Sequence, residues 1–322
     1  GAPFIANAAA AAGQKWKVQT AWDAGTTGYT LFEEWANSIK EKSGGELEIT
    51  PFSAKAVAAD NNALFDAVRN GVLQGMNAFT LYWSGKIPAS VFLSSYPAGP
   101  DQPMQWDTMF YGLGMLEMTR EIYRKKGMMY VGPIQHDANI IHSKKPVESV
   151  DDFKGMKIRV PGGMVAEVFQ QFGVSTVSLP GSDIFPALEK GTIDAAEWCC
   201  PKPDSVFGFQ KVLKHYYLQG LHQATDIGDI YINLDWWTEL PADLQAIFEG
   251  GIMSCIADTY NWNVYQNGTA LQELVKKQGV KVLDTPEDYY PAYMKATQEV
   301  LDKYSAKDAF FKKVLTGSAG HR

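Results

Sequence analysis

The 322-residue chain has few cysteines, no excess of basic residues and no long apolar run. Because no run of about 18 apolar residues occurs, no segment is predicted to cross a membrane as a helix. The formal net charge of −7 argues against a nucleic-acid partner, since such proteins gather lysine and arginine on one face. These absences favour a small-molecule partner.

Cysteine usage excludes a complete disulfide framework. The three cysteines, Cys199, Cys200 and Cys255, are odd in number and form no C-x-x-C pair. A zinc site is not predicted, because the five histidines form no H-x-x-x-H or H-E-x-x-H pattern. We interpret the adjacent Cys199 and Cys200 as buried side chains, since free cysteine is among the most buried residue types.

Common catalytic motifs are missing as well, among them G-x-S-x-G, the P-loop and G-x-G-x-x-G. We therefore expect a protein that is not an enzyme. A cysteine-dependent enzyme is the alternative, with Cys199 or Cys200 as nucleophile and His215 or His222 as base.

The chain does have the composition of an ordered protein, with 46% hydrophobic and 20% charged residues. Its length predicts about two domains. Strand-like and helix-like segments alternate, which predicts two α/β lobes with mainly parallel sheets and a ligand cleft between them. The expected strands are 16–21, 46–52, 139–142, 156–160 and 175–179, and the expected helices include 30–43 and 165–172.

A short internal similarity supports this arrangement. Segments 65–75 and 185–195 share Phe, Ala, a branched aliphatic residue, Gly and a second aliphatic residue in register. In each, we expect a short helix to end at a left-handed glycine, Gly71 or Gly191, and to lead into a buried strand. A chance match of common residues is the alternative.

The ends of the chain differ from its middle. Residues 1–14 are small and apolar, typical of a signal-peptide remnant or a tag scar, and the first interpretation implies export to the periplasm. Apolar residues at helical spacing predict long helices after residue 241, which could pack over both lobes or form a homodimer. The expected divisions are 1–14, lobe 1 at 15–137, lobe 2 at 138–235 and C-terminal helices at 236–322.

Two motifs carry a family resemblance. SVDDFKGMKIRVPGG at 149–163 and DIFPALEKGTIDAAEW at 183–198 resemble the extracytoplasmic solute receptors of tripartite ATP-independent periplasmic (TRAP) transporters, of the DctP type. Within them the sequence is most similar to the α-keto acid and lactate binders. The resemblance implies a soluble periplasmic receptor with two lobes, which closes on a small organic acid and docks on the membrane permease subunits.

Arg159, in the K-I-R-V-P-G run, is implied by this resemblance to grip the substrate carboxylate. The chemistry agrees, because a planar guanidinium matches a carboxylate in a two-pronged geometry and stays charged when desolvated. Pairing of Arg159 with Asp151 or Asp152 is the structural alternative.

Aromatic residues are expected to wall the pocket. Trp198 is placed in the cleft by the resemblance, Tyr82 is expected to face it from the first lobe, and Trp22 is a weaker candidate. Trp83, beside Tyr82, is more simply interpreted as a core residue.

The resemblance also implies Na⁺ or Ca²⁺ bridging protein oxygens and the ligand carboxylate, although no cofactor is expected to be required. Glu197 would supply a carboxylate and Trp198 its backbone carbonyl. The family's ligating glutamine falls at Ala138, next to the candidate Asn139, and its acidic ligand falls at Gln223, which lowers the expected calcium affinity.

Three questions stay open at this stage. A buried Glu197 needs a metal, Arg159 or protonation to compensate it. Asp226 and Asp229 could replace a missing ligand or could be solvated turn residues. The ligand could also be another organic anion, such as an aromatic carboxylate or a sulfonate.

Overall fold

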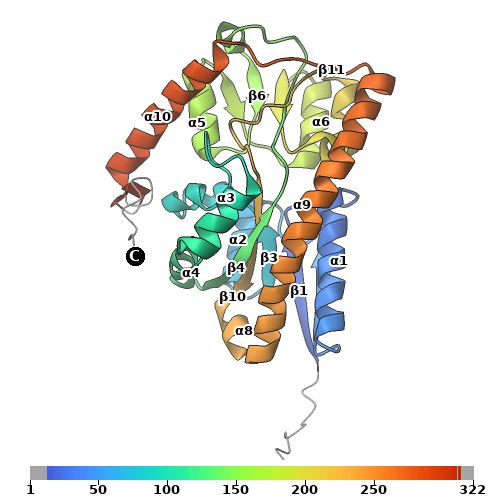
Figure 1. The fold of residues 1–322 in the computed structure, drawn as a ribbon, viewed down its shortest axis with the longest axis vertical. Helices are drawn as coiled ribbons and strands as arrows, with labels where there is room; N and C mark the ends of the chain where they lie inside the picture. The colour runs from blue at the N-terminus through green and yellow to red at the C-terminus, as the bar shows by residue number, and fades with distance from the viewer. Residues whose placement is uncertain (1–12, 310, 313–322) are drawn as a thin grey trace, which may run out of the picture.

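The computed structural model describes residues 13–309 and 311–312, which form two α/β lobes stacked along the long axis of the molecule (Figure 1). The expected leader at 1–14 lies outside the described residues, apart from its last two positions. Gln14 already belongs to the first strand, so the ordered fold begins one residue earlier than expected.

The sheet of the first lobe is mixed. β1 (Gln14–Thr20) lies parallel to β2 (Leu47–Phe52) and β3 (Gly75–Ala78), as the βαβ pattern predicts. β10 (Ile227–Asn233) then runs antiparallel to β3 and to β4 (Met128–Gln135), which gives the order β2-β1-β3-β10-β4. Trp16 and Val18 of β1 are fully buried, so the alternating positions of this strand form the centre of the core.

Helices cover this sheet because each carries an apolar stripe. In α1 (Thr27–Lys42), Phe32, Trp35 and Ile39 pack on the sheet, and the hydroxyl of Thr26 caps the first turn. The other helices of the lobe are α2 (Asn61–Arg69), α3 (Pro103–Asp107) and α4 (Met115–Arg124), with helical turns η1 (Thr80–Trp83), η2 (Pro88–Phe92) and η3 (Thr108–Gly112).

The sheet of the second lobe has the order β11-β9-β5-β8-β6-β7 and is also mixed. Its strands are β5 (Ile141–Ser143), β6 (Lys157–Arg159), β7 (Ser175–Val177), β8 (Ala195–Glu197), β9 (His215–Tyr217) and β11 (Lys281–Val282). Its helices are α5 (Gly163–Gln171), α6 (Gly181–Glu189) and α7 (Pro201–Val206), with turns η4 (Val150–Phe153) and η5 (Phe209–Lys211). Phe169 and Ile158 lie in its largest apolar cluster.

One strand changes the expected lobe boundary. β10 lies within the segment 138–235, which was assigned to the second lobe, yet it pairs only with strands of the first sheet. The chain therefore returns to the first lobe before residue 227. The prediction that lobe 2 extends to residue 235 is wrong, because β10 belongs to lobe 1. Strand pairing across more than 90 residues leaves no local pattern in the sequence.

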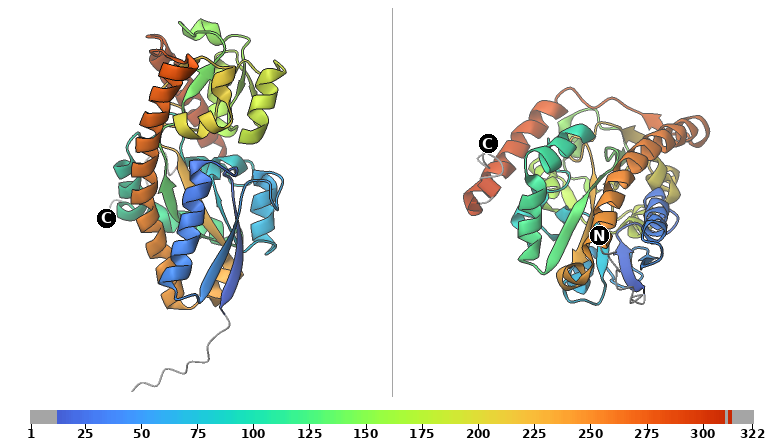
Figure 2. Two further views of the ribbon diagram at one scale, coloured as in Figure 1. Left: turned by 90° about the vertical axis from the view of Figure 1, so that its right-hand side faces the viewer. Right: turned by 60° about the horizontal axis from the view of Figure 1, so that its bottom comes forward.

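The long helix α9 (Ala242–Gln278) joins both lobes, as expected for the C-terminal region (Figures 1 and 2). Phe248 and Ile252 pack in the core of the first lobe, whereas Leu274 packs with Ile140 and Tyr216 of the second. The short α8 (Leu234–Glu239) precedes it, and α10 (Tyr289–Lys307) packs on α5. Association into a homodimer through these helices stays a prediction.

The internal similarity corresponds to a repeated local structure. α2 and α6 each end at a left-handed glycine, Gly71 with φ 74° and Gly191 with φ 72°. In both, the amide of the third residue after the helix donates to a carbonyl of its last turn, from Val72 to Ala67 and from Thr192 to Ala187. The buried strands β3 and β8 follow. The helix, glycine and strand order predicted for both lobes is confirmed.

None of the helices within the described ranges is long and apolar enough to cross a membrane.

His136 follows β4, where the chain leaves the first lobe. We expect it to lower the free energy of unfolding at acidic pH. It is buried, its Nδ1 lies 3.1 Å from the Nδ2 of Asn263 in α9, and burial lowers its pKa to about 3. In the unfolded chain this histidine binds a proton as the pH falls through about 6.5, whereas in the folded chain it stays neutral. Its contribution to the free energy of unfolding is therefore fully present above pH 6.5 and decreases below it.

We expect chemical denaturation between pH 7 and 4 to show this loss, with a slope of at most ~1.4 kcal/mol per pH unit from this one group. In His136→Gln the pH dependence should be smaller over the same window, because no group titrates there. Parallel curves for the two proteins would contradict this assignment.

Candidate ligand-binding site

A small cavity of about 20 Å³ lies between the lobes, at the carboxyl ends of strands from both sheets. Trp22 follows β1, Arg159 ends β6 and Trp198 follows β8. This is the edge at which α/β sheets hold their ligands. The lining residues are Ala21, Trp22, Phe79, Leu81, Tyr82, Asn139, Arg159, Pro161, Trp198, Gln223 and Asp226.

The expected site residues therefore line one cavity, except for Glu197. Trp22, Tyr82, Asn139, Arg159 and Trp198 all line this cavity, as does Gln223. Glu197 does not line it and lies behind Arg159 instead.

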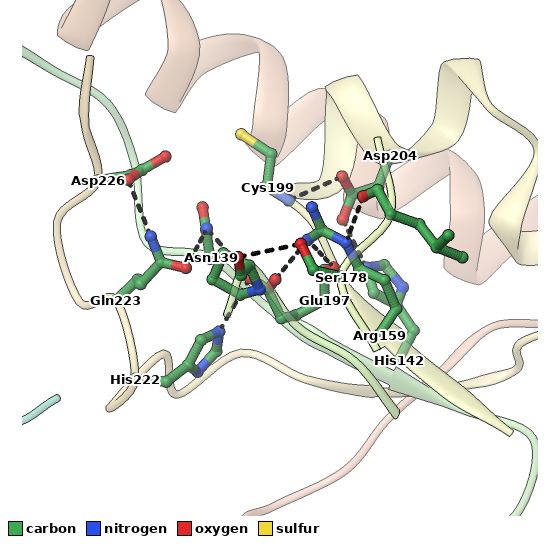
Figure 3. Close-up of polar contacts among 12 residues, drawn as sticks. Asn139, His142, Arg159, Ser178, Glu197, Cys199, Asp204, His222, Gln223 and Asp226 are labelled. Atoms are coloured by element: carbon green, nitrogen blue, oxygen red, sulfur yellow. Dashed lines mark hydrogen bonds and ion pairs between the residues drawn. The ribbon is translucent and has the colours of Figure 1, made fainter. Parts of the chain in front are cut away.

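Arg159 lines the cavity and is buried, with 1% of its surface exposed (Figure 3). Its Nε donates to the carbonyl of Leu179 at 2.9 Å, and its Nη1 donates to the backbone carbonyl and to Oε1 of Glu197 at 2.7 and 2.5 Å. Its Nη2 has no hydrogen-bond partner in the described chain. The alternative pairing with Asp151 or Asp152 is wrong, since both lie on the exposed turn η4.

Glu197 is held by three side chains (Figure 3). Besides Arg159 at Oε1, the Nδ2 of Asn139 donates to Oε2 at 3.2 Å, and the Nε2 of His222 lies 3.4 Å from the same oxygen. Burial alone would raise the pKa of Glu197, but the charge of Arg159 and the contacts with His222 and Asn139 outweigh it and lower the pKa. A metal, Arg159 or protonation was expected to compensate the buried charge of Glu197, and in the structure Arg159 does so.

A chain of amides continues from Glu197 along the cavity. The Nδ2 of Asn139 also donates to Oε1 of Gln223 at 3.1 Å, and the Nε2 of Gln223 donates to Oδ1 of Asp226 at 3.1 Å. The Oδ1 of Asn139 is buried and has no hydrogen-bond partner among the described residues. Burial, with the negative charge of Glu197, raises the pKa of Asp226 to about 8, so its carboxyl is mostly protonated at neutral pH.

Asp226 and Asp229 are not solvated turn residues, because both are buried. Asp229 lies in β10, where the hydroxyls of Tyr130 and Tyr231 donate to its two oxygens at 2.6 and 3.1 Å. Burial raises the pKa of Asp229 well above the ordinary value. The sequence signal for this buried carboxyl is the position of Asp229 within the otherwise mostly apolar strand I-G-D-I-Y-I-N.

Two tryptophans meet across the cleft. The rings of Trp22 from the first lobe and Trp198 from the second lie 5.5 Å apart at 88°, an edge-to-face contact. Tyr82 lines the same cavity from the first lobe. Trp83 lies instead in the core, where its Nε1 donates to the hydroxyl of Tyr123 at 2.6 Å.

Burial disfavours the adjacent cysteines as nucleophiles, because it disfavours the thiolate. Cys199 and Cys200 are buried with their sulfurs 3.2 Å apart, and burial raises the pKa of both thiols. Neither His215 nor His222 contacts them in the described chain. Asp204 accepts from the backbone amide of Cys199 at 3.1 Å, and the side chain of Asn267 lies within hydrogen-bond reach of Cys200.

Asp204 in turn pairs with a histidine that the sequence had not singled out. Its Oδ2 lies 2.6 Å from the Nε2 of His142, and both side chains are fully buried. This pair anchors the start of α7 just behind the cleft wall.

The candidate cation ligands lie close together but carry little net charge. Within the described ranges, three or more His, Cys, Asp or Glu side chains nowhere gather as a ligand cluster. The Nδ2 of Asn139 joins Glu197 Oε2 and Gln223 Oε1 through two hydrogen bonds, its Oδ1 has no partner within the described ranges, and Trp198 follows Glu197 in the chain. Because Arg159 already balances the single carboxylate, these oxygens fit Na⁺ better than Ca²⁺.

Comparison with known proteins identifies a family. Residues 18–308 match DctP, the bacterial extracellular solute-binding proteins of family 7. The chain is 31% identical over 301 residues to a monocarboxylate 2-oxoacid-binding periplasmic protein of Nostoc sp., covering 93% of this chain and 82% of that protein.

Two solved structures are similar over nearly the whole chain. A TRAP solute-binding protein of Bordetella bronchiseptica, a mixed-occupancy dimer with calcium and picolinate, has a TM-score of 0.89 at 28% identity, covering 95% and 90% of the two chains. One from Pseudoalteromonas atlantica, with sodium and pyruvate, has a TM-score of 0.87 at 29% identity, covering 94% and 92%. The chain therefore belongs to the DctP family of TRAP transporter solute-binding proteins.

Proposed function

We propose that this TRAP solute-binding protein is a periplasmic receptor for a small organic monocarboxylate of the 2-oxo or 2-hydroxy acid class. The main support is the buried guanidinium of Arg159, whose Nη2 is unpartnered and which lines a cavity between the lobes. A buried cationic donor without a partner is costly, and a ligand carboxylate would satisfy it.

The energetics are consistent with this role. Charge-assisted hydrogen bonds contribute about 1.5–3 kcal/mol each, and micromolar affinity requires roughly 8 kcal/mol. One or two such bonds from Arg159 therefore supply a large share. The unpartnered Oδ1 of Asn139 can accept from a 2-hydroxyl group, and the hydroxyl of Tyr82, which lies close to Arg159, can donate to the same carboxylate.

Lobe closure would complete the site. Trp22 and Asn139 are almost fully buried, at 3% and 2% exposure, so a ligand has to enter while the lobes are further apart. Closure brings Trp22 against Trp198, expels water and strengthens the polar contacts of Arg159. The closed, loaded form would then dock on the membrane permease subunits.

Na⁺ is the cation that we propose for this site. The oxygens of Asn139 and Gln223 and the carbonyl of Trp198 would hold it beside the cavity, and Glu197, which does not line the cavity, would add negative charge next to them. A bound cation would supply positive charge to the ligand's carboxylate and 2-oxo oxygens. The sodium and pyruvate of the Pseudoalteromonas protein support this choice.

An aromatic carboxylate is the second candidate ligand, because the Bordetella protein holds picolinate. The contact between Trp22 and Trp198 across the cleft favours the smaller acids.

A thermal-shift screen tests the proposal. Pyruvate or lactate at about 100 times its dissociation constant should stabilise the fold by about 2.7 kcal/mol, which raises the melting temperature. The neutral solute glycerol, at equal concentration, should have no such effect. Sodium removal should weaken the shift more than EDTA does. A folded protein whose melting temperature responds to no organic acid would contradict the proposed function.

A further inference from the structure

The two tryptophans that wall the cavity each rest on a helical glycine that does not itself line the cavity. Trp22 lies against Gly28 in the first turn of α1, and Trp198 lies against Gly181, the first residue of α6. The two glycines are in different lobes. On both sides of the cleft, therefore, the wall consists of an indole that lies against a glycine in the first turn of a helix.

Gly28 has no room for a side chain. A Cβ atom there would lie 2.3 Å from Cδ2 and 2.4 Å from Cε2 of Trp22, far inside contact distance. Its φ is not in the left-handed region, so the backbone would accept any residue. Alanine would be the better helix former at this position. The indole of Trp22 is therefore what requires glycine.

Gly181 repeats this relation in the second lobe. A Cβ atom would lie 2.7 Å from Cε2 and 2.8 Å from Nε1 of Trp198, and 3.0 Å from Cζ of Phe207. Here too φ is not in the left-handed region. Again the indole, and not the backbone, explains the glycine.

Neither indole can simply retreat from an added methyl group. Trp22 already has Phe79 and His136 edge-on at ring distances of 5.3 and 5.0 Å. Trp198 has Phe207 edge-on at 4.7 Å. Since protein interiors are close-packed and both indoles line the ligand cavity, displacing either indole changes the shape of that cavity.

We propose that Gly28 and Gly181 are positioning residues that set the width of the ligand cavity and so determine which acids fit it. This inference rests on the proposed function, because it assigns a limit to the side group of the same monocarboxylate. Arg159 would hold the carboxylate, while the spacing of the two indoles would limit the opposite end of the ligand.

The test is a calorimetric titration of pyruvate and of 2-oxobutyrate, which is one methylene longer. Gly28→Ala and Gly181→Ala should bind pyruvate about tenfold more weakly, as overpacking of a tight site predicts. Both should lose more for 2-oxobutyrate, so the ratio of the two affinities should rise. A merely structural role would lower both affinities equally and leave this ratio unchanged.

Matched controls are available in α9, where Gly250 and Gly268 have nothing within 4 Å of an added Cβ. Gly250→Ala and Gly268→Ala should leave both affinities within about twofold of wild type. In the Gly28→Ala background, Trp22→Phe should restore the affinity ratio, because the smaller ring leaves room for the methyl group. The same rescue keeps the test usable if Gly28→Ala alone folds poorly.

The outcomes separate the two proposals. If the wild type binds no 2-oxo or 2-hydroxy acid, the proposed function fails. If the wild type binds pyruvate and the alanine variants keep its affinity ratio, the inference about Gly28 and Gly181 is overturned while the proposed function stands.

Discussion

Arg159→Ala is expected to lower the free energy of unfolding by about 3–5 kcal/mol and to abolish carboxylate binding. The stability loss follows because Glu197 would remain buried and ionised without its principal partner at 2.5 Å. The binding loss follows because the cavity would lose the guanidinium that we propose as the anchor. Urea denaturation and calorimetric titration with pyruvate measure the two effects separately.

Arg159→Lys is the matched control for this variant. A lysine keeps the positive charge beside Glu197 but lacks the planar second nitrogen that reaches the ligand. We expect a smaller loss of stability than in Arg159→Ala, with a comparable loss of affinity. Full stability and unchanged affinity in Arg159→Ala would show that neither role is correct.

The double variant Arg159→Met with Glu197→Leu should recover most of the stability that either single change removes. Breaking a buried ion pair leaves one charge uncompensated, whereas replacing both partners by apolar residues of similar size is often neutral or stabilising. Glu197→Leu alone should cost about 3–5 kcal/mol, because Arg159 would then be the unpaired charge. The double variant should nevertheless bind no carboxylate.

This comparison separates the structural role of the pair from its role in binding. Urea denaturation of the four proteins gives the coupling energy between Arg159 and Glu197, and pyruvate titration of the same samples gives the affinities. A stable double variant that still binds pyruvate would exclude Arg159 as the anchor. Additive stability losses would mean that the two side chains do not compensate each other.

Local patterns predicted much of the fold. The apolar stripe of α1, the glycines Gly71 and Gly191 and the helical spacing of α9 depend on neighbouring residues, so the sequence shows them directly. The position of β10 could not be predicted in this way. Its partners β3 and β4 lie far away in the chain, and an antiparallel central strand carries no local mark.

The candidate site, like the fold, could be predicted only in part from the sequence. The resemblance brought Arg159, Trp198 and Asn139 to one place, but it left the partner of Glu197 open. The structure supplies that partner through strand register, since β6 lies beside β8 with Arg159 opposite Ala196, one residue before Glu197. The role of His222 was missed, because its contact with Glu197 depends on a loop that no periodic pattern describes.

The central claim is that Arg159 recognises the carboxylate of a small acid inside the closed cleft. Calorimetric titration of wild type and Arg159→Met with pyruvate and with its neutral amide tests this most directly. We predict that wild type binds pyruvate at least ~10-fold more tightly than the amide, as loss of one or two charge-assisted hydrogen bonds implies, and that Arg159→Met removes the difference. Equal affinity of wild type for the two compounds, or a preference that survives in Arg159→Met, would contradict the claim.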